Sequence, residues 1–479
     1  MIRCRLLALA VAAGVAATSL AAVQPATAAP PPGHGAPGIG DPYFPLDGNG
    51  GIDVLRYDVH DRYRFVERRL SGRTRVTLVA TEDLAGFNLD FLLRVRSVKV
   101  GGRDVRFDQD RRHELAIHRA MDEGDRATFV VRYTGRPGKV GYAGERNWLA
   151  SRHEVVAMNQ PHMAPWWFPA NDHPRDRAAI RISITVPKGK QVIANGKRVG
   201  RVVHGKRATT TWKPDEPMVP YLAFFAAGDF DIDRGRDHGS PWLVAVSERL
   251  APSTQAHAMQ LLRRSAALQS WIEDALGADY PFSTTGGVAT SLDSGFALEN
   301  QTRPTYSPRS LDTLTVVHEL AHQWFGDSVT VHGWADIWLN EGAATFFEVL
   351  YDEEHGGPTG EQWLRRVYDD LGAGHSLWGH EVADPCPDPS GCSSVNDIFA
   401  THVYLRGAMT VQALRNRLGD DDLFEVLRRW VTERGGTTGT TAQFEALAEE
   451  VGGEDLAPFF ESWLHTAEKP ADTAVNGLG

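Results

Sequence analysis

The sequence predicts an α+β protein in which a β-rich part precedes a helix-rich part. Short alternating or β-branched runs, separated by Gly, Pro and Asp turns, fill the chain from about Ile52 to about Asp231. Beyond Pro241 apolar residues recur at helical spacing, and each such segment ends at Gly or Asn/Asp. Strands followed by helices indicate separate domains, which we place at residues 52–235 and 236–465.

The composition is that of a globular protein. The 479 residues are 42% hydrophobic and 23% charged, enough for two or three domains with cores of their own. The formal net charge of -11 argues against nucleic acid or an anionic membrane surface as the main partner. We therefore expect a protein that binds neither nucleic acid nor, once its N-terminal segment is removed, a membrane. Separately, we expect a monomer.

Residues 1–29 have the layout of a secretory signal peptide. A basic start, "MIRCR", precedes an apolar segment, and "ATAA" supplies small residues for cleavage after Ala28 or Ala29. The alternative is a membrane anchor, because Leu6–Val23 is 18 mostly apolar residues long. The Ala-rich composition and the cleavage pattern favour the signal, so we expect a secreted protein. The Pro/Gly-rich residues 30–51 then predict a disordered or extended lead-in.

Cysteine usage agrees with export. Cys4 would leave with the signal peptide, and Cys386 and Cys392 lie close together in the loop sequence "CPDPSGC". In an oxidising compartment these two residues most simply form a local disulfide.

The segment "VVHELAHQWFGD" (residues 316–327) carries the strongest chemical signal. His318 and His322 lie four residues apart, so on a helix both imidazoles leave from one face. We expect this helix to start at Ser307-Pro308 and to end at Gly326. Its apolar surroundings predict burial, where imidazoles need partners: a zinc ion, or hydrogen bonds within a core helix.

Glu341 supplies a third metal ligand. It lies in "WLNEGAATFFE", eighteen residues beyond His322, and two His with one Glu form a catalytic zinc set with a position left for water. Zinc lowers the pKa of a bound water to about 7, and Glu319 is placed to take that proton and pass it to a leaving amine. The alternative for Glu341 is a carboxylate favoured by the helix dipole. We predict a hydrolase with one zinc ion per chain.

These motifs resemble those of the aminopeptidase N family of gluzincin peptidases, which also contains a bifunctional epoxide hydrolase. "HELAHQWFGD" and "WLNEG" match in residues and spacing, and the similarity extends over about residues 52–464. "FALEN" (residues 296–300) stands where the family has Gly-Ala-Met-Glu-Asn, and "YLRG" (404–407) where it has Tyr-Glu-Lys-Gly. "NQPHMAPWWFPANDHP" (159–174) resembles the segment that carries a substrate-facing Gln.

The resemblance implies roles for single residues. Glu299, with Gln160 as a neutral helper, would bind the ammonium of a free N-terminus, and Ala297 and Asn300 belong to the same substrate-binding motif. Tyr404 would donate to the oxyanion as water adds to the scissile carbonyl. We expect the aromatic run "PWWFP" to pack between domains.

The resemblance also implies an architecture. A saddle-like N-terminal domain would contribute Gln160 to a thermolysin-like, mainly helical catalytic domain, followed by a tail at residues 466–479. We therefore expect no large C-terminal helical domain, and a more open site than in relatives that have one.

Four positions depart from the family pattern. Phe296 replaces the first Gly of its motif, Leu298 replaces Met, and Arg406 replaces Lys. His162 stands where some relatives have a second acidic residue, which would leave ammonium recognition more dependent on Glu299.

The function predicted is that of a secreted zinc aminopeptidase. A thermolysin-type endopeptidase is the first alternative, since the zinc motif itself does not distinguish the two modes of attack. A second alternative is a non-catalytic extracellular binding module on a peptidase fold. The sequence argues against it, because the zinc ligands, Glu319 and Tyr404 are all intact. An epoxide hydrolase side activity has no signature of its own here.

Overall fold

The computed structural model describes residues 33–110, 113–385 and 395–479. The expected signal peptide and the expected Cys386–Cys392 disulfide lie outside these residues. Gly33–Gly479 forms one compact unit. None of the helices in the described ranges is both long enough and apolar enough to cross a membrane.

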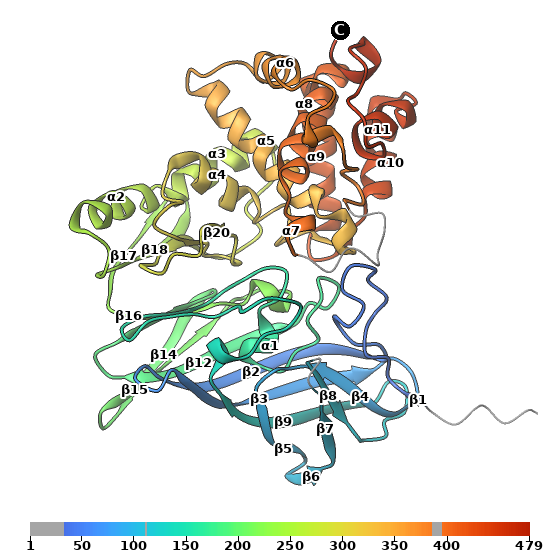
Figure 1. Cartoon of the computed structure of the whole chain (residues 1–479). Coiled ribbons are helices and arrows are strands. Elements are labelled where there is room, and N and C mark those ends of the chain that lie inside the picture. The colour runs from blue at the N-terminus through green and yellow to red at the C-terminus, as the bar shows by residue number, and fades with distance from the viewer. Residues whose placement is uncertain (1–32, 111–112, 386–394) are drawn as a thin grey trace, which may run out of the picture. The chain divides into compact units, whose positions relative to one another are not determined.

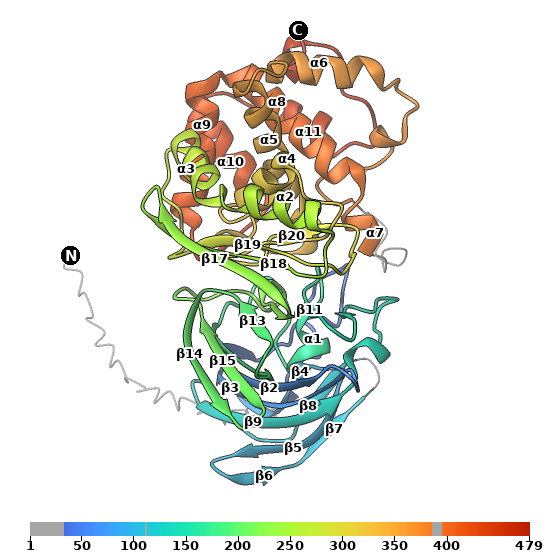
Figure 2. The ribbon, with the colours of Figure 1, turned by 90° about the vertical axis from the view of Figure 1, so that its left-hand side faces the viewer.

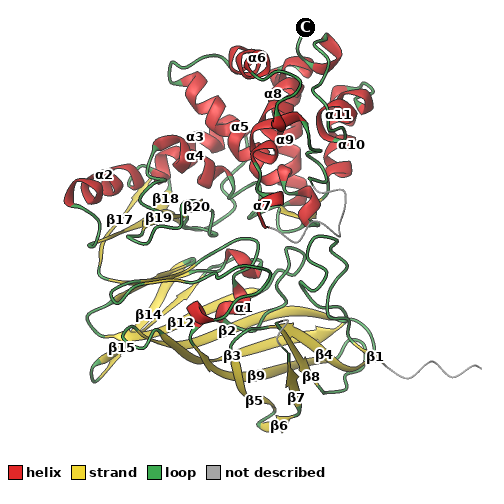
Figure 3. Cartoon of the chain, in the orientation of Figure 1, coloured by secondary structure: helices red, strands yellow, loops and turns green. Residues whose placement is uncertain are grey.

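Strands dominate the first part of this unit (Figure 3). The described strands form an eight-stranded sheet in the order β14-β15-β12-β2-β3-β9-β5-β6, and two four-stranded sheets ordered β1-β4-β8-β7 and β10-β11-β16-β13. Their bounds are β1 Gly33–His34, β2 Ile52–Arg64, β3 Arg69–Ala80, β4 Leu84–Asp90, β5 Arg94–Val100, β6 Arg103–Val105, β7 Phe107–Gln109, β8 Glu114–Ile117, β9 Arg126–Gly135, β10 Leu149–Ala150, β11 Val155–Ala157, β12 Ala179–Pro187, β13 Gln191–Ala194, β14 Lys197–His204, β15 Arg207–Lys213 and β16 Phe225–Gly228.

The aromatic run "PWWFP" packs inside the β-rich part. Trp166 and Trp167 belong to the short helix α1 (Ala164–Trp167), are fully buried and join the core formed by the strands. Trp167 donates from Nε1 to the carboxylate of Asp61 on β2 at 2.8 Å. The expectation that this run packs between domains is therefore wrong. A buried indole N–H requires a polar partner, and a carboxylate inside the β core supplies it.

The second part combines a smaller sheet with helices, as a β-rich part followed by a helical one predicts (Figure 1). Its sheet has the order β17-β18-β19-β21-β20, and helices α2 and α3 lie along it (Figure 2). The expected boundary at residue 235 falls inside β17. The bounds are β17 Phe230–Asp237, β18 Ser240–Ser247, β19 Thr285–Ala289, β20 Ala297–Leu298, β21 Thr305–Tyr306, β22 Thr330–Val331, β23 Thr438–Gly439, α2 Pro252–Leu262, α3 Ser265–Leu276, α4 Thr313–Ala321, α5 Trp338–Glu354, α6 Gly360–Asp370, α7 Val395–Ile398, α8 Gly407–Leu418, α9 Asp420–Arg434, α10 Thr441–Gly452 and α11 Ala457–Leu464.

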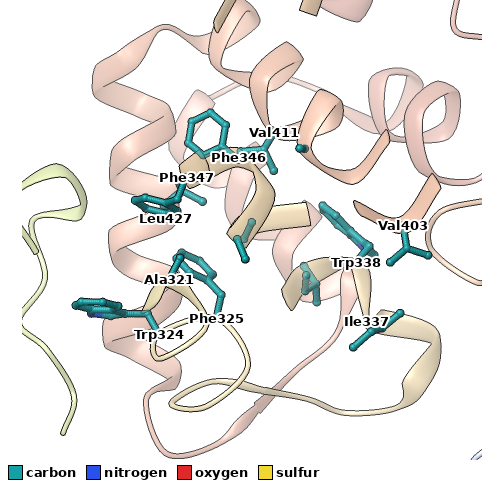
Figure 4. Packing of buried hydrophobic residues seen from close by; sticks show 14 of the residues in the cluster. Ala321, Trp324, Phe325, Ile337, Trp338, Phe346, Phe347, Val403, Val411 and Leu427 are labelled. Atoms are coloured by element: carbon teal, nitrogen blue, oxygen red, sulfur yellow. The ribbon is translucent and has the colours of Figure 1, made fainter. Parts of the chain in front are cut away.

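The helical core surrounds the central helix α5. Figure 4 shows Phe346 and Phe347 of α5 close to Val411 of α8 and Leu427 of α9, all of them buried. Trp324 and Phe325, which follow α4, belong to the same core. This core holds α4 and α5 beside each other, and these two helices carry the predicted metal ligands.

The lead-in is irregular in backbone but packed. Tyr43 and Phe44 are both 4% exposed. The carboxylate of Asp41 accepts hydrogen bonds from the Trp334 backbone N–H at 3.0 Å and from His173 Nε2 at 3.1 Å. The composition predicts a disordered or extended lead-in. From Gly33 onward, apolar burial and these hydrogen bonds order the segment, which has little regular structure beyond β1.

Candidate metal centre and active site

Helix α4 presents both histidines on one face. Its N-cap is Asp312, whose carboxylate accepts from the Thr315 backbone N–H at 2.9 Å and from the Thr315 hydroxyl at 2.7 Å. The helix therefore starts at Thr313 and not at Ser307-Pro308, because the capping acceptor lies closer to the apolar run. His322 follows the last helical residue but keeps helical dihedrals, φ -56° and ψ -24°, so it stays aligned with His318.

Glu341 of α5 completes a compact set of three ligand atoms. One ring nitrogen of each histidine and a Glu341 oxygen all lie within 4.8 Å of one another, and all three residues are buried. Glu341 Oε2 is 3.4 Å from His318 Nε2 and 3.3 Å from His322 Nε2.

Hydrogen bonds fix which nitrogen of each imidazole faces this point. His318 Nδ1 lies 2.6 Å from a carboxylate oxygen of Glu348, and His322 Nδ1 lies 3.0 Å from the Phe325 carbonyl oxygen. Both Nε2 atoms therefore point toward Glu341. Outer partners of this kind orient metal-binding histidines, and the donor set of two nitrogens and one oxygen fits a single zinc-like ion.

The pKa shifts of two ligands, His322 and Glu341, both favour positive charge at this point. Burial disfavours the imidazolium form of His322, but Glu341 and Glu299 outweigh it and raise its pKa to about 9. Burial likewise opposes ionisation of Glu341, but the two histidines lower its pKa to about 2. Without a metal ion, the charge of Glu341 thus favours protonated histidines. A metal cation that binds here would release these protons and take the three residues as ligands.

Glu319 lines the same cavity as the three ligands and follows His318 directly. Its carboxyl is buried, and its Oε2 has no hydrogen-bond partner within the described residues. Burial raises its pKa to about 8, against the opposing charges of His318 and His322. A carboxyl with a pKa near neutrality is suited to general acid–base work.

Tyr404 faces the ligands from a π-helical turn, His402–Arg406, that runs directly into α8. Its ring stacks on His318 with centroids 6.1 Å apart and an interplanar angle of 19°. Burial, together with the charges of Glu341, Glu299 and Glu319, raises the pKa of this phenol well above its ordinary value. Its hydroxyl therefore stays protonated, and it is hydrogen-bonded to Glu341.

Two motif glycines bring α5 and the Tyr404 turn together. A Cβ added at Gly342 would lie 2.9 Å from the Gly407 Cα, and one added at Gly407 would lie 2.9 Å from the Gly342 Cα. Because no side chain fits between them, the glycine in "WLNEG" and the glycine in "YLRG" allow the backbone of Glu341 to pass close to that of Tyr404.

Arg406 anchors the same turn. Its guanidinium is fully buried and donates to four backbone carbonyls, at distances of 2.9 to 3.4 Å. These carbonyls belong to Trp378, His380, Ser462 and Thr466. The planar fork of an arginine suits this arrangement better than a lysine ammonium would, which gives a structural reason for Arg at this position.

A cavity of about 1150 Å³ opens onto the metal ligands, and its wall includes Gln160, Ala297 and Glu299 together with Glu319 and Tyr404. Gln160 Nε2 donates to Glu299 Oε1 at 2.9 Å. The β-rich part thus contributes Gln160 to a site built mainly by the helical part.

Two residues of the predicted substrate region lie behind the wall. The buried amide of Asn300 donates to the Leu222 carbonyl at 3.3 Å, and Asn300 does not line the cavity; it secures its loop instead. His162 is buried between Asp47 and Glu145. Phe296, by contrast, lies at the cavity wall and is 41% exposed.

Three polar residues of the site were not predicted from the sequence. Glu348 lies seven residues beyond Glu341 on α5, so helical periodicity could have placed it on the same face. Gln323 follows His322 directly, and it donates to the Glu299 carbonyl at 3.0 Å and accepts from the Thr302 N–H at 2.7 Å. Glu145 has no signal in the sequence around it.

Comparisons with known proteins agree with this geometry. Residues 265–463 match the peptidase family M1 domain. Aminopeptidase 2 of Candida albicans is 24% identical over 440 residues, which cover 86% of this chain and 47% of that protein. Aminopeptidase N of Lactococcus lactis subsp. lactis is 24% identical over 448 residues, which cover 85% of this chain and 50% of that protein. The chain spans about half the length of these two relatives.

Solved structures match over a larger share of their length. The M1 zinc metallopeptidase of Deinococcus radiodurans superposes with a TM-score of 0.76 at 27% identity, covering 86% of this chain and 93% of that one. A mutant of that protein bound to a Tyr-Ser-Ala substrate gives a TM-score of 0.80 at 25% identity, covering 91% of this chain and 100% of that one. The metal ligands, Glu319 and Tyr404 gather at one cavity, and residues 265–463 match the domain of peptidase family M1, whose aminopeptidases and zinc metallopeptidases this chain resembles over most of its length.

Proposed function

We propose that this protein is a zinc aminopeptidase, which hydrolyses the first peptide bond of peptides with a free N-terminus. The observation that carries this proposal is a single cavity lined both by a three-ligand metal set and by the hydrogen-bonded pair Gln160–Glu299. The aminopeptidases and the substrate-bound zinc metallopeptidase similar to this chain support it.

One zinc ion per chain would be held by His318, His322 and Glu341. The two nitrogen ligands and one carboxylate leave a position open, as catalytic zinc sites do. When bound, the ion supplies Lewis-acid polarisation of a water and of the scissile carbonyl. Glu348 and the Phe325 carbonyl keep the imidazoles oriented toward it.

Glu319 and Tyr404 perform the proton and charge steps. Glu319 accepts a proton from the attacking water and delivers it to the nitrogen of the leaving amine, so the carboxylate is regenerated in each turnover. The Tyr404 hydroxyl donates to the carbonyl oxygen as negative charge develops there. Tyr404 serves this role because its phenol keeps its proton beside three carboxylates.

The free N-terminus is selected by charge. Glu299 is buried in the cavity wall and receives a hydrogen bond from Gln160, but a neutral amide does not compensate a buried carboxylate. A substrate ammonium supplies the missing positive charge, whereas an acetylated N-terminus offers none. This preference separates an aminopeptidase from a thermolysin-type endopeptidase.

Export is a separate proposal that rests on the sequence of residues 1–29. Expressed in a bacterial host, the chain should appear in the exported fraction with a new N-terminus at Ala29 or Pro30, as N-terminal sequencing would report. A cytoplasmic chain that retains Met1 would contradict export but would leave the enzymatic proposal untouched.

The decisive experiment compares free and blocked substrates. The purified chain should cleave a panel of aminoacyl anilides, lose that activity to a chelator and regain it with zinc. It should leave the N-acetylated forms intact. Cleavage of internal bonds in N-acetylated peptides, at rates similar to the free forms, would favour the endopeptidase.

A further inference from the structure

We propose that Glu145 is a second carboxylate for the substrate's N-terminal ammonium, and that His162 is the residue that positions it. The inference deepens the proposed aminopeptidase function and rests on it. It starts from the contact between Glu145 and the buried His162. In this structure His162 does not reach the cavity, but its partner Glu145 does.

A tight turn delivers Glu145 to the cavity wall. The Glu145 N–H donates to the Tyr142 carbonyl at 2.8 Å, and the two residues between them, Ala143 and Gly144, have φ values of 48° and 82°. Ala143, Gly144 and Glu145 all line the cavity. A left-handed alanine is unfavourable by itself, so contacts of the surrounding residues must hold this turn in place.

The Glu145 carboxylate is fixed at both oxygens. Oε2 lies 2.5 Å from His162 Nδ1, and Oε1 accepts from Asn159 Nδ2 at 3.3 Å. The side chain is 11% exposed, so it combines burial with access to the cavity. Asn159 immediately precedes Gln160, whose amide binds Glu299 at 2.9 Å. Both carboxylates therefore line the cavity, and each is hydrogen-bonded to one of two consecutive residues, Asn159 and Gln160.

His162 is held from its other side by Asp47. Its Nε2 lies 2.5 Å from Asp47 Oδ2, so each ring nitrogen faces one carboxylate, and the ring is 1% exposed. Burial disfavours its charged form, but Asp47 and Glu145 outweigh burial and raise the pKa of His162 well above its ordinary value. The imidazolium donates to both carboxylates, which fixes the rotamer of Glu145.

The remaining acceptor capacity of Glu145 is available to a ligand. An ionised carboxylate offers about four lone-pair positions. The two hydrogen bonds above use only part of them, and the bond from the Asn159 amide is long. An ammonium has three N–H donors, and two carboxylates with the Gln160 side-chain oxygen can accept them. His162 thus holds the Glu145 carboxylate at the cavity wall.

The test uses two zinc-binding inhibitors that differ only in the amino group, leucine hydroxamate and 4-methylpentanoyl hydroxamate. In the wild-type zinc enzyme the amino form should bind more tightly. In Glu145→Gln the inhibition constant of the amino form should rise about tenfold, the effect of losing a charge-assisted hydrogen bond, while that of the desamino form stays within twofold. The control Glu123→Gln removes an exposed carboxylate from the same β-rich part and should change neither constant.

His162→Gln tests the positioning role. It should lower the preference for the amino form in the same direction as Glu145→Gln, and the double variant should show little further loss. If Glu145→Gln binds both hydroxamates as the wild type does, or weakens both equally, the inference is wrong. A wild-type enzyme that does not prefer the amino form would instead contradict the aminopeptidase proposal itself.

Discussion

Replacing Tyr404 with phenylalanine removes one hydroxyl and nothing else from the proposed transition-state site. The ring that stacks on His318 at 6.1 Å is retained, and so is the adjoining turn, which Arg406 anchors through backbone carbonyls. The metal ligands are untouched. We therefore expect Tyr404→Phe to fold with unchanged stability and to bind one zinc ion.

The expected loss lies in kcat. The phenol remains protonated in the working pH range because burial and three nearby carboxylates raise its pKa well above its ordinary value, so the wild type always presents a donor. Removing one preorganised donor to a developing oxyanion costs about a hundred- to a thousandfold in kcat, or about 3–4 kcal/mol. KM should change little, because the bond strengthens only in the transition state.

Steady-state kinetics on an aminoacyl anilide, with zinc content measured on the same samples, provide the assay. Tyr351→Phe is the matched control, since its hydroxyl lies outside the cavity wall and accepts from Arg264 Nη2 at 2.9 Å. The control should keep wild-type kcat. A Tyr404→Phe enzyme with full zinc and a kcat within threefold of the wild type would refute the oxyanion role of Tyr404.

Three further substitutions test other parts of the account. Gly342→Ala places a methyl group 2.9 Å from Gly407 backbone atoms, so we expect about 1–3 kcal/mol of destabilisation, measurable by chemical unfolding; an unchanged stability would show that the helices separate freely. Glu319→Gln should retain one zinc ion but lose at least about a hundredfold in kcat, and full activity would remove Glu319 from the mechanism. Burial raises the pKa of Asp61 from its ordinary value of 3.8 to about 7. Between about pH 4 and pH 7 the folded state therefore holds a proton that the unfolded state has lost. The free energy of unfolding should fall as the pH rises through this range. Asp61→Asn should reduce that slope by up to about 1.4 kcal/mol per pH unit in urea titrations; an identical slope would contradict the raised pKa of the buried Asp61 carboxyl.

The metal ligands could be predicted from the sequence because their geometry is local. A spacing of four residues aligns His318 and His322 on any helix, and Glu341 opens the next helical segment. The order of a β-rich part and a helical part followed from periodicity in the same way. The ends of helices were predicted less accurately. Helix α4 starts after the capping residue Asp312 and not at the expected Ser307-Pro308.

The features that could not be predicted depend on contacts between distant segments. Glu145 reaches the cavity through a turn and a buried imidazole, and it lies 154 residues before Glu299, with no sequence pattern that connects the two. The packing of the lead-in depends on Asp41 finding Trp334, far along the chain. The approach of Gly342 to Gly407 explains two motif glycines only once both helices are seen together. Local patterns do not encode such pairings, since each depends on the completed fold.

Titration of the metal-free protein with zinc, while release of the first residue from a free peptide is followed, tests the central claim most directly. Activity should rise linearly and reach its plateau at one zinc ion per chain, and Glu341→Gln should require far more zinc for the same occupancy, since one of three ligands is lost. Activity that is independent of zinc, or a Glu341→Gln variant that titrates like the wild type, would contradict the assignment of this site as the catalytic metal centre.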